Sequence, residues 1–498
     1  MADARKYVAV DLGAESGRVM VGEVSERGIA LTEMHRFPNL QISVPTKGPT
    51  PRLHWDILRL WHEIKIGIAR VAAEHDVAGV GVDTWGVDFA LLDAHGELLG
   101  NPVCYRDSRT DGMVDALFAR LPKETLYGVT GIQTMALNTL FQLAALAWGK
   151  SPQLAAAKHI LFLPDLLTFW LCGRMGTEYT IASTSQMLDA RTRRWSPAVF
   201  DVLGVDASLF PPIDMPGETG SLRGTLLASV SEKLAAANVP VIAVGSHDTA
   251  SAVAAVPAEG SGDWLYLSSG TWSLLGAETD QPVLSEAAAR YNVTNEGGVG
   301  GKIRLLKNIA GLWLLQECKR EWARAGNDLD YPEITRLAGA AEGHTALLDL
   351  DDPAFATPGG MPAKIAAQCR RTAQRVPETP GQFARVILES LAVSYRRVIA
   401  MLEEITGKKF RRLHIVGGGS RNDLLNQMAA DATGLDLLAG PVEATALGNV
   451  LTQAIAVGQI ASLAAGRALV ARMGGVKRFT PRDVSQWTQF AARATART

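Results

Sequence analysis

The sequence predicts an α/β protein with two large domains. Its 498 residues exceed the roughly 100–200 residues that one domain usually contains. Short runs of β-branched residues alternate with longer stretches of helical pattern, which is typical of α/β architecture. Two strand–turn–strand segments, starting at residues 7 and 264, share a turn of small residues. Their separation by half the chain indicates a duplicated fold, with one copy in each domain.

The N-terminal segment contains three predicted strands. Residues 7–12, 19–24 and 29–37 carry apolar side chains at strand spacing, and Ser25–Gly28 reads as a turn between the last two. The turn after the first strand, Gly13–Arg18, is rich in small residues. The opening therefore predicts a β-meander.

Two further glycine-containing turns follow strands in the second half of the chain. The segment Trp264–Leu275 reads as a strand, a tight turn and a second strand. Residues 413–416 form another predicted strand, and Gly417–Gly419 follow it. A helix is expected over residues 422–432, with Gly434 as its C-terminal cap.

The domain boundary is placed near Asp248. A buried strand is predicted over residues 239–244 and a helix over residues 249–256, with a polar cluster between them. We therefore expect an N-terminal domain at 1–247, a C-terminal domain at 248–465, and a helical extension at 466–498.

Two stretches in the second half need separate interpretation. Residues 350–379 are rich in Pro, Asp and Gly and predict a long loop. The uncharged stretch 444–465 contains Asn449, Gln453 and Gln459, so we expect two soluble helices joined near Gly458 rather than a membrane span.

Composition excludes several classes of protein. The formal charge is -2, from 49 basic and 51 acidic residues, which gives no electrostatic footprint for nucleic acid or an anionic membrane. The four cysteines are scattered, so we expect reduced core thiols and no disulfides. No apolar segment with a cleavage site follows the N-terminus. We expect a cytoplasmic protein.

The turns Gly13–Arg18 and Ser268–Thr271 are candidate phosphate cradles. Backbone amides and small hydroxyls can surround phosphate oxygens where no bulky side chain blocks approach. Neither turn matches the P-loop or dinucleotide fingerprint, and an ordinary hairpin is the alternative for each. Asp11, at the end of the first strand, can hold Mg²⁺ through water. Gly417–Gly419 can lie under a nucleotide, or can be a flexible turn.

Asp248 is the candidate general base. It lies where a buried strand ends and a helix begins, and a carboxylate there can accept the proton of a sugar hydroxyl that attacks a phosphoryl group. The alternative is a helix N-cap, a position that Asp favours. His247 alone is more typical of a hydrogen-bonded core histidine.

A sugar site is expected around residues 83–88 and 105–109. Polar side chains and an exposed Trp85 at strand ends suit hydroxyl groups and a flat sugar ring. A loop held by salt bridges is the alternative.

Together these segments resemble the FGGY carbohydrate kinases, and within them the branch that acts on L-rhamnulose. The resemblance rests on residues 8–19, 83–89, 105–109, 246–253, 266–273, 295–298, 306–309, 311–316, 414–419 and 439–444. It implies the two-domain actin/hexokinase/Hsp70-like (ribonuclease H-like) fold with an active site in the interdomain cleft. It further implies that the N-terminal domain at 1–247 binds the sugar and that the C-terminal domain at 248–465 binds ATP. It also implies ATP-dependent phosphorylation of L-rhamnulose at C1, giving L-rhamnulose 1-phosphate in L-rhamnose catabolism.

The resemblance implies roles for individual residues. The catalytic base is Asp248, and the sugar-binding residues are Gly86, His247, Asp248 and Thr249. The ATP-binding residues are Ala14, Glu15, Ser16, Gly17, Arg18, Thr271, Asn308, Gln316 and Gly418. Asp11 holds Mg²⁺ through water. The expected partners are L-rhamnulose and ATP, without nucleic acid or membrane, and the expected state is a monomer, with a weak homodimer as the alternative.

Two departures and two rival functions accompany the resemblance. Ala14 stands where the wider superfamily often has Thr, so one hydroxyl toward phosphate is absent. Glu15 would repel phosphate, so we expect it to point away or to pair with Arg18. The rivals are a kinase for another ketose, such as L-fuculose or L-xylulose, and a non-catalytic nucleotide switch of the actin/Hsp70 type.

Overall fold

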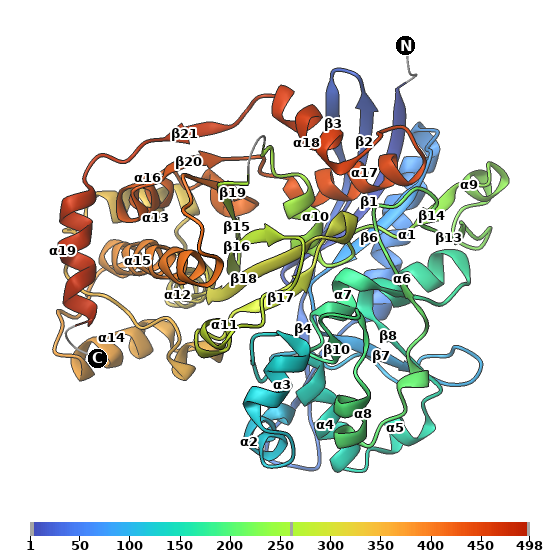
Figure 1. Ribbon diagram of the computed structural model, residues 1–498, viewed down its shortest axis with the longest axis horizontal. Helices are drawn as coiled ribbons and strands as arrows, with labels where there is room; N and C mark the ends of the chain where they lie inside the picture. The colour runs from blue at the N-terminus through green and yellow to red at the C-terminus, as the bar shows by residue number, and fades with distance from the viewer. Residues whose placement is uncertain (1–3, 259–261, 496–498) are drawn as a thin grey trace. The chain divides into compact units, whose positions relative to one another are not determined.

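The computed structural model describes residues 4–258 and 262–495, drawn in Figure 1. The chain divides into two compact units. The first contains residues 1–259, 278–305 and 444–474, and the second contains residues 260–277, 306–443 and 475–498. Each unit is therefore assembled from segments that are distant in the sequence.

A six-stranded sheet organises the first unit, in the order β13-β14-β6-β1-β2-β3. These strands are β1 (Arg5–Leu12), β2 (Ser16–Ser25), β3 (Gly28–Pro38), β6 (Val80–Thr84), β13 (Leu222–Thr225) and β14 (Pro240–Ile242). β1, β2 and β3 form the expected antiparallel meander, whereas β1, β6 and β14 are parallel. The carboxyl ends of these three parallel strands therefore meet at one edge of the sheet.

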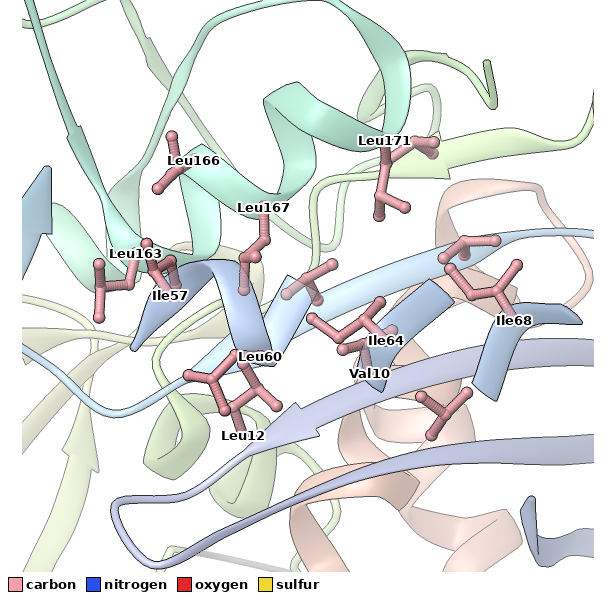
Figure 2. Packing of buried hydrophobic residues seen from close by; sticks show 14 of the residues in the cluster. Val10, Leu12, Ile57, Leu60, Ile64, Ile68, Leu163, Leu166, Leu167 and Leu171 are labelled. Carbon is pink, nitrogen blue, oxygen red and sulfur yellow. The ribbon is translucent and has the colours of Figure 1, made fainter. Parts of the chain in front are cut away.

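Two helices, α1 (Ile57–Glu74) and α6 (Leu163–Cys172), pack with β1 in the main core of the first unit. α1 begins after Asp56, whose carboxylate accepts a hydrogen bond from the Arg59 amide. Its buried residues recur every three or four positions, so one stripe of the helix faces the core. Figure 2 shows Ile57, Leu60, Ile64 and Ile68 of α1, Val10 and Leu12 of β1, and Leu163, Leu166, Leu167 and Leu171 of α6 in this core.

A seven-stranded sheet, in the order β17-β18-β16-β15-β19-β20-β21, organises the second unit and repeats this strand arrangement in its last six strands; β17 (Thr294–Gly297) is the additional edge strand. These strands are β15 (Trp264–Ser269), β16 (Trp272–Thr279), β18 (Ile303–Ala310), β19 (Arg412–Val416), β20 (Asp436–Ala439) and β21 (Lys477–Phe479). β15 is antiparallel to β16 and parallel to β19, as β1 is antiparallel to β2 and parallel to β6. The predicted duplication is confirmed.

Helices and short strands complete the two units. They are β4 (Gln41–Val44), β5 (Arg52–Trp55), β7 (Phe89–Leu92), α2 (Met113–Phe118), α3 (Lys123–Thr130), α4 (Thr139–Trp148), α5 (Pro152–Ala156), β8 (His159–Phe162), β9 (Thr177–Glu178), α7 (Tyr179–Ser183), β10 (Leu188–Asp189), β11 (Arg194–Trp195), α8 (Pro197–Leu203), β12 (Ile213–Asp214), α9 (Glu232–Ala236), α11 (Glu286–Arg290), β17 (Thr294–Gly297), α12 (Trp313–Arg324), α13 (Tyr331–Ala340), α15 (Pro380–Thr406) and α19 (Val484–Thr495). Cys104, Cys172, Cys318 and Cys369 are buried and free.

Most of the predicted helices are present. The helices expected over 249–256 and 422–432 are α10 (Asp248–Ala254) and α16 (Asp423–Thr433), and Gly434 ends α16 with a φ of 73°. The stretch 444–465 forms α17 (Ala444–Ala456) and the start of α18 (Leu463–Arg472). Within the described ranges, no helix has the length and apolar character needed to cross a bilayer.

Two sequence predictions need correction. The loop expected over 350–379 contains the helix α14 (Met361–Arg371), because Gly360 and Pro362 mark the helix start and its buried residues, Ile365 and Cys369, recur four positions apart. The strand expected over 239–244 is shorter, since β14 ends at Ile242. The chain rejoins β6 further on, where the Thr84 amide donates to the Ser246 carbonyl at 2.8 Å.

Candidate functional site

Three carboxylates are brought together at the carboxyl edge of the first unit's sheet. Asp11 on β1 and Asp83 on β6 are partners in the register of two parallel strands. Asp248 begins α10, directly after the segment that bonds to Thr84. Burial, together with the charge of Asp11, raises the pKa of Asp83 well above its usual range. Such a concentration of negative charge suits a cation.

Asp83 had no assigned role in the sequence-based prediction. Its side chain is fully buried, and Asn449 of α17 donates to Asp83 Oδ2 at 2.6 Å. Asp83 Oδ1 has no hydrogen-bond partner among the described residues. The available signal was that Asp11 and Asp83 both follow β-branched runs, but their pairing is set by the sheet register, which the sequence does not reveal.

Asp248 presents a partly exposed carboxylate. Its side chain is 30% exposed, and the Thr249 hydroxyl donates to Asp248 Oδ1 at 3.0 Å. His247 Nε2 lies 3.5 Å from the same oxygen. Burial raises the Asp248 pKa, and the electrostatic interaction with the neighbouring His247 opposes that rise. His247 occupies the N-cap position and α10 has no side-chain cap, so Asp248 is not the N-cap residue.

Glu178 holds the segment that leads to Asp248. The Ser246 amide donates to Glu178 Oε2 at 3.1 Å, and the Ser246 hydroxyl donates to the same oxygen. The Thr180 hydroxyl also donates to Glu178, and in turn accepts from the His247 amide at 3.2 Å. Glu178 was not singled out from the sequence, because Ser246, the residue through which it holds this segment, lies 68 positions away along the chain.

Ala14 and Glu15 lie in the turn between β1 and β2, whereas Ser16, Gly17 and Arg18, which were expected in that turn, begin strand β2. The Asn39 side chain donates to the Gly13 carbonyl at 2.9 Å, and the Asn39 amide donates to the Glu15 carbonyl at 2.9 Å. Arg18 donates to the Asp11 carboxylate. The turn is therefore fixed from outside by Asn39, and the expected pairing of Glu15 with Arg18 stays a prediction.

The Gly86–Asp88 segment forms a strained turn beside His247. The Asp88 amide donates to the Gly86 carbonyl at 2.9 Å, and Val87 between them has a φ of 67°, which a β-branched residue rarely adopts. The Thr184 hydroxyl accepts from the Val87 amide at 3.1 Å. A Cβ atom added to Gly86 would lie 3.4 Å from His247 Nε2. Gly86 thus brings bare backbone close to the histidine.

Trp85 is buried, which corrects the expectation that it is exposed. Its ring lies 4.3 Å from that of Trp55, and both indole N–H groups donate to Asp88 Oδ2. Gln142 donates to Asp88 Oδ1 at 3.0 Å. Burial raises the Asp88 pKa to about 6. The Trp85 side chain therefore belongs to the support of the turn and presents no face to a sugar ring.

A salt bridge between Arg52 and Asp107 holds the 105–109 loop, which is the alternative to a sugar site that the sequence left open. Asp107 is buried and accepts from the Arg52 guanidinium and from the Leu53 amide. Arg109 donates to Gln142, and burial lowers the Arg109 pKa to about 10. The loop is thereby held against Gln142, which also donates to Asp88.

In the second unit, the β15–β16 turn meets the start of α12. The Leu312 amide donates to the Gly270 carbonyl at 3.0 Å, and the Trp313 amide donates to the Thr271 carbonyl at 3.1 Å. α12 carries Gln316, whose Oε1 is buried without a hydrogen-bond partner among the described residues. The structure therefore connects two predicted ATP-binding residues, Thr271 and Gln316. A third, Asn308, lies on β18, the neighbour of β16.

The glycine turn after β19 abuts the β15 turn. A Cβ atom at Gly419 would lie 2.0 Å from Ser269 Oγ, whereas one at Gly418 would meet nothing within 4 Å. The Tyr395 hydroxyl of α15 lies 2.9 Å from Ser273 Oγ, and burial raises the Tyr395 pKa to about 12. The turn bearing Gly418 therefore lies beside the turn bearing Thr271, at the carboxyl ends of two parallel strands.

Family models match most of the chain. The N-terminal domain of the FGGY family of carbohydrate kinases matches residues 6–255, and the C-terminal domain of that family matches residues 265–457. Several relatives named rhamnulokinase match nearly the full length. That of Bacteroides thetaiotaomicron is 46% identical, covering 97% of each chain, and that of Halalkalibacterium halodurans is 40% identical, covering 96% of this chain and 99% of the relative.

Solved structures share the fold at low sequence identity. A gluconate kinase from Lactobacillus acidophilus has a TM-score of 0.77 at 15% identity, covering 99% of this chain and 97% of that one. Plasmodium falciparum glycerol kinase with ADP has a TM-score of 0.77 at 17% identity, covering 99% of this chain and 98% of that one. The expected two-domain α/β fold is confirmed.

Proposed function

This chain belongs to the FGGY family of carbohydrate kinases, and we propose that it transfers the γ-phosphoryl group of ATP to the C1 hydroxyl of L-rhamnulose. The products are L-rhamnulose 1-phosphate and ADP, a step of L-rhamnose catabolism. The substrate rests on the relatives named rhamnulokinase, which are 40–46% identical over nearly the whole chain.

Asp248 acts as the general base, and its geometry is the observation that carries the mechanism. Its Oδ1 accepts from Thr249 and faces His247 Nε2, so we assign proton removal to Oδ2. As the C1 oxygen forms its bond to the γ-phosphorus, the bond from that phosphorus to the β,γ-bridging oxygen breaks, and ADP leaves. General-base assistance of this kind contributes about 10²–10⁴-fold.

The sugar side of the site lies in the first unit. Gly86, His247, Asp248 and Thr249 are within one neighbourhood, because a Cβ at Gly86 would already contact the His247 ring. The missing side chain at Gly86 leaves room for a sugar hydroxyl to reach backbone groups. The strained Val87 conformation supports this assignment, since such strain persists where function over-determines the backbone.

The nucleotide side uses backbone turns. In the first unit, residues 14–18 comprise the end of the β1–β2 turn and the start of β2. In the second unit, Thr271 and Gly418 lie on adjoining turns, with Gln316 and Asn308 nearby in the fold. Small residues leave the amides of these turns accessible to phosphate oxygens. The placement of one active site in an interdomain cleft stays a prediction, as do the boundaries at residues 247 and 465.

The kinase uses ATP with a divalent metal ion, and we assign Mg²⁺ to that role. We assign to Asp11 a contact with this ion through water. Its position as the register partner of the buried Asp83 supports the assignment. When bound, Mg²⁺ neutralises charge on the phosphate oxygens. A monomeric state and a cytoplasmic location complete the proposal.

The test is ADP release with Mg·ATP across L-rhamnulose, L-fuculose and L-xylulose, with the product's phosphate position read by NMR. We expect the highest kcat/KM for L-rhamnulose and a phosphate on C1. Equal turnover of another ketose would retain the kinase and reject the substrate. Slow ATP turnover that no sugar changes would favour the nucleotide switch.

A further inference from the structure

Arg304 and Glu296 surround the side of His247 that faces away from Asp248. Arg304 is fully buried, and its Nη2 lies 3.0 Å from His247 Nδ1. The same Arg304 nitrogen lies 3.1 Å from Glu296 Oε2, and the Arg304 Nε donates to the Gly297 carbonyl at 2.7 Å. All four residues belong to the first unit, so this arrangement is internal to it.

A guanidinium group can donate hydrogen bonds but cannot accept them. His247 Nδ1 must therefore present its lone pair to Arg304, and the proton of the neutral ring is on Nε2. Nε2 is the nitrogen that lies 3.5 Å from Asp248 Oδ1, so a donor lies on the side of the ring that is nearest the catalytic carboxylate. In the opposite tautomer, a lone pair would face the carboxylate and repel it.

Glu296 is the competing partner for the same ring nitrogen. Its Oε2 lies 3.4 Å from His247 Nδ1, which is longer than the 3.0 Å to Arg304. Arg304 also neutralises Glu296 within the buried pair, which removes the charge that would otherwise draw a proton to Nδ1. The shorter contact therefore decides the tautomer.

We propose that Arg304 is a positioning residue that fixes His247 in its Nε2–H tautomer, so that the ring presents a donor and not a lone pair on the side of Asp248 and the attacking sugar hydroxyl. The inference rests on the proposed function for its catalytic meaning, whereas the tautomer itself is a property of the free protein. In other enzymes, a histidine held in the wrong tautomer beside a catalytic carboxylate lowers kcat. We therefore expect kcat of this kinase to depend on the contact between Arg304 and His247.

The experiment is ¹⁵N NMR of the full-length protein labelled at histidine, with the His247 signals assigned by their absence in His247→Gln. We expect the wild type to show a protonated Nε2 and an unprotonated Nδ1. Arg304→Met should lose that pattern and lower kcat about 10–100-fold, with little change in the KM for ATP. Arg304→Lys, which can still only donate, should restore the tautomer and most of kcat.

Arg385→Met is the matched control, because it breaks an ion pair with the fully buried Glu389 and lies in the second unit, whereas His247 lies in the first. It should leave the His247 signals unchanged. A wild-type ring protonated on Nδ1, or an unchanged tautomer in folded Arg304→Met, would overturn the inference. The wild-type spectrum decides the tautomer even if the Arg304 variants do not fold. If the Nε2–H tautomer is found while no ketose is phosphorylated, the proposed function fails and the tautomer assignment stands.

Discussion

Asp88 shows how single side chains support the sugar-side turn without touching a ligand. Its carboxylate accepts from the indoles of Trp55 and Trp85 and from Gln142, while its own amide closes the turn through Gly86. The residue is almost fully buried, which disfavours the charged form. The position of Gly86 beside His247 thus depends on a carboxylate whose pKa is raised by burial to about 6.

We expect this carboxylate to make stability depend on pH. Its pKa rises from 3.8 to about 6 in the folded protein, so the folded state binds the proton more tightly than the unfolded state. The resulting stabilisation is complete below about pH 4 and is lost as the pH rises through about 6. The free energy of unfolding of wild type minus that of Asp88→Asn should fall by roughly 3 kcal/mol between these limits.

Urea denaturation at a series of pH values measures this difference. Asp93→Asn is a control of opposite sign, because backbone hydrogen bonds from Glu97 and His95 lower the Asp93 pKa. A pH-independent difference for Asp88→Asn would show that the Asp88 pKa is not raised.

At the scale of elements, α10 carries Asp248 and packs closely on α17. A Cβ atom at Gly448 of α17 would lie 1.7 Å from the Ser251 carbonyl oxygen of α10. Gly448→Ala should therefore displace α10 and lower the free energy of unfolding by about 1–3 kcal/mol. Thermal unfolding and kcat should both report the change, because α10 begins at the catalytic carboxylate.

Gly128→Ala provides the matched control for that substitution. Gly128 lies inside α3, where an added Cβ would meet nothing within 4 Å. Alanine should stabilise the helix there by about 0.5–1 kcal/mol. Equal effects of the two substitutions would contradict the close approach of α10 and α17.

The glycine turn after β19, on the nucleotide side of the second unit, offers a similar pair of test and control substitutions at Gly419 and Gly418. Gly419→Ala should lower the melting temperature, since its Cβ would collide with Ser269, which precedes the β15–β16 turn. Gly418→Ala should leave the melting temperature near that of wild type but raise the KM for ATP, because Gly418 faces open space where we place the nucleotide. A normal KM for ATP in Gly418→Ala would remove Gly418 from the ATP site.

For the whole molecule, the repeated strand pattern could be predicted because each strand–turn–strand segment is formed by residues that are close together in the sequence. The runs before Asp11 and Ser269 are short, apolar and followed by small residues, so both hairpins were visible from the sequence. The helix α14 was missed because Pro and Gly, which usually mark loops, here mark the start of a helix.

The supporting residues could not be predicted, because long-range pairing defines them. Asp83 gains its place by register with Asp11, and Glu178 by reaching Ser246. Arg304 contacts His247 only in the folded protein, because the two residues are 57 positions apart in the sequence. Trp85 was expected to be exposed because an aromatic residue among polar neighbours gives no indication of the second tryptophan that covers it. Motifs thus identified Asp248 and Gly86, whereas their supports required the fold.

The measurement that most directly tests the central claim is kcat for Asp248→Asn with L-rhamnulose and Mg·ATP. Asparagine keeps the size of the side chain and can still accept from Thr249, but it cannot take the sugar proton. We predict a loss of about 10²–10⁴-fold in kcat, with an unchanged melting temperature and retained binding of the ketose. Near-normal kcat in a folded Asp248→Asn protein would contradict the account and place the general base elsewhere.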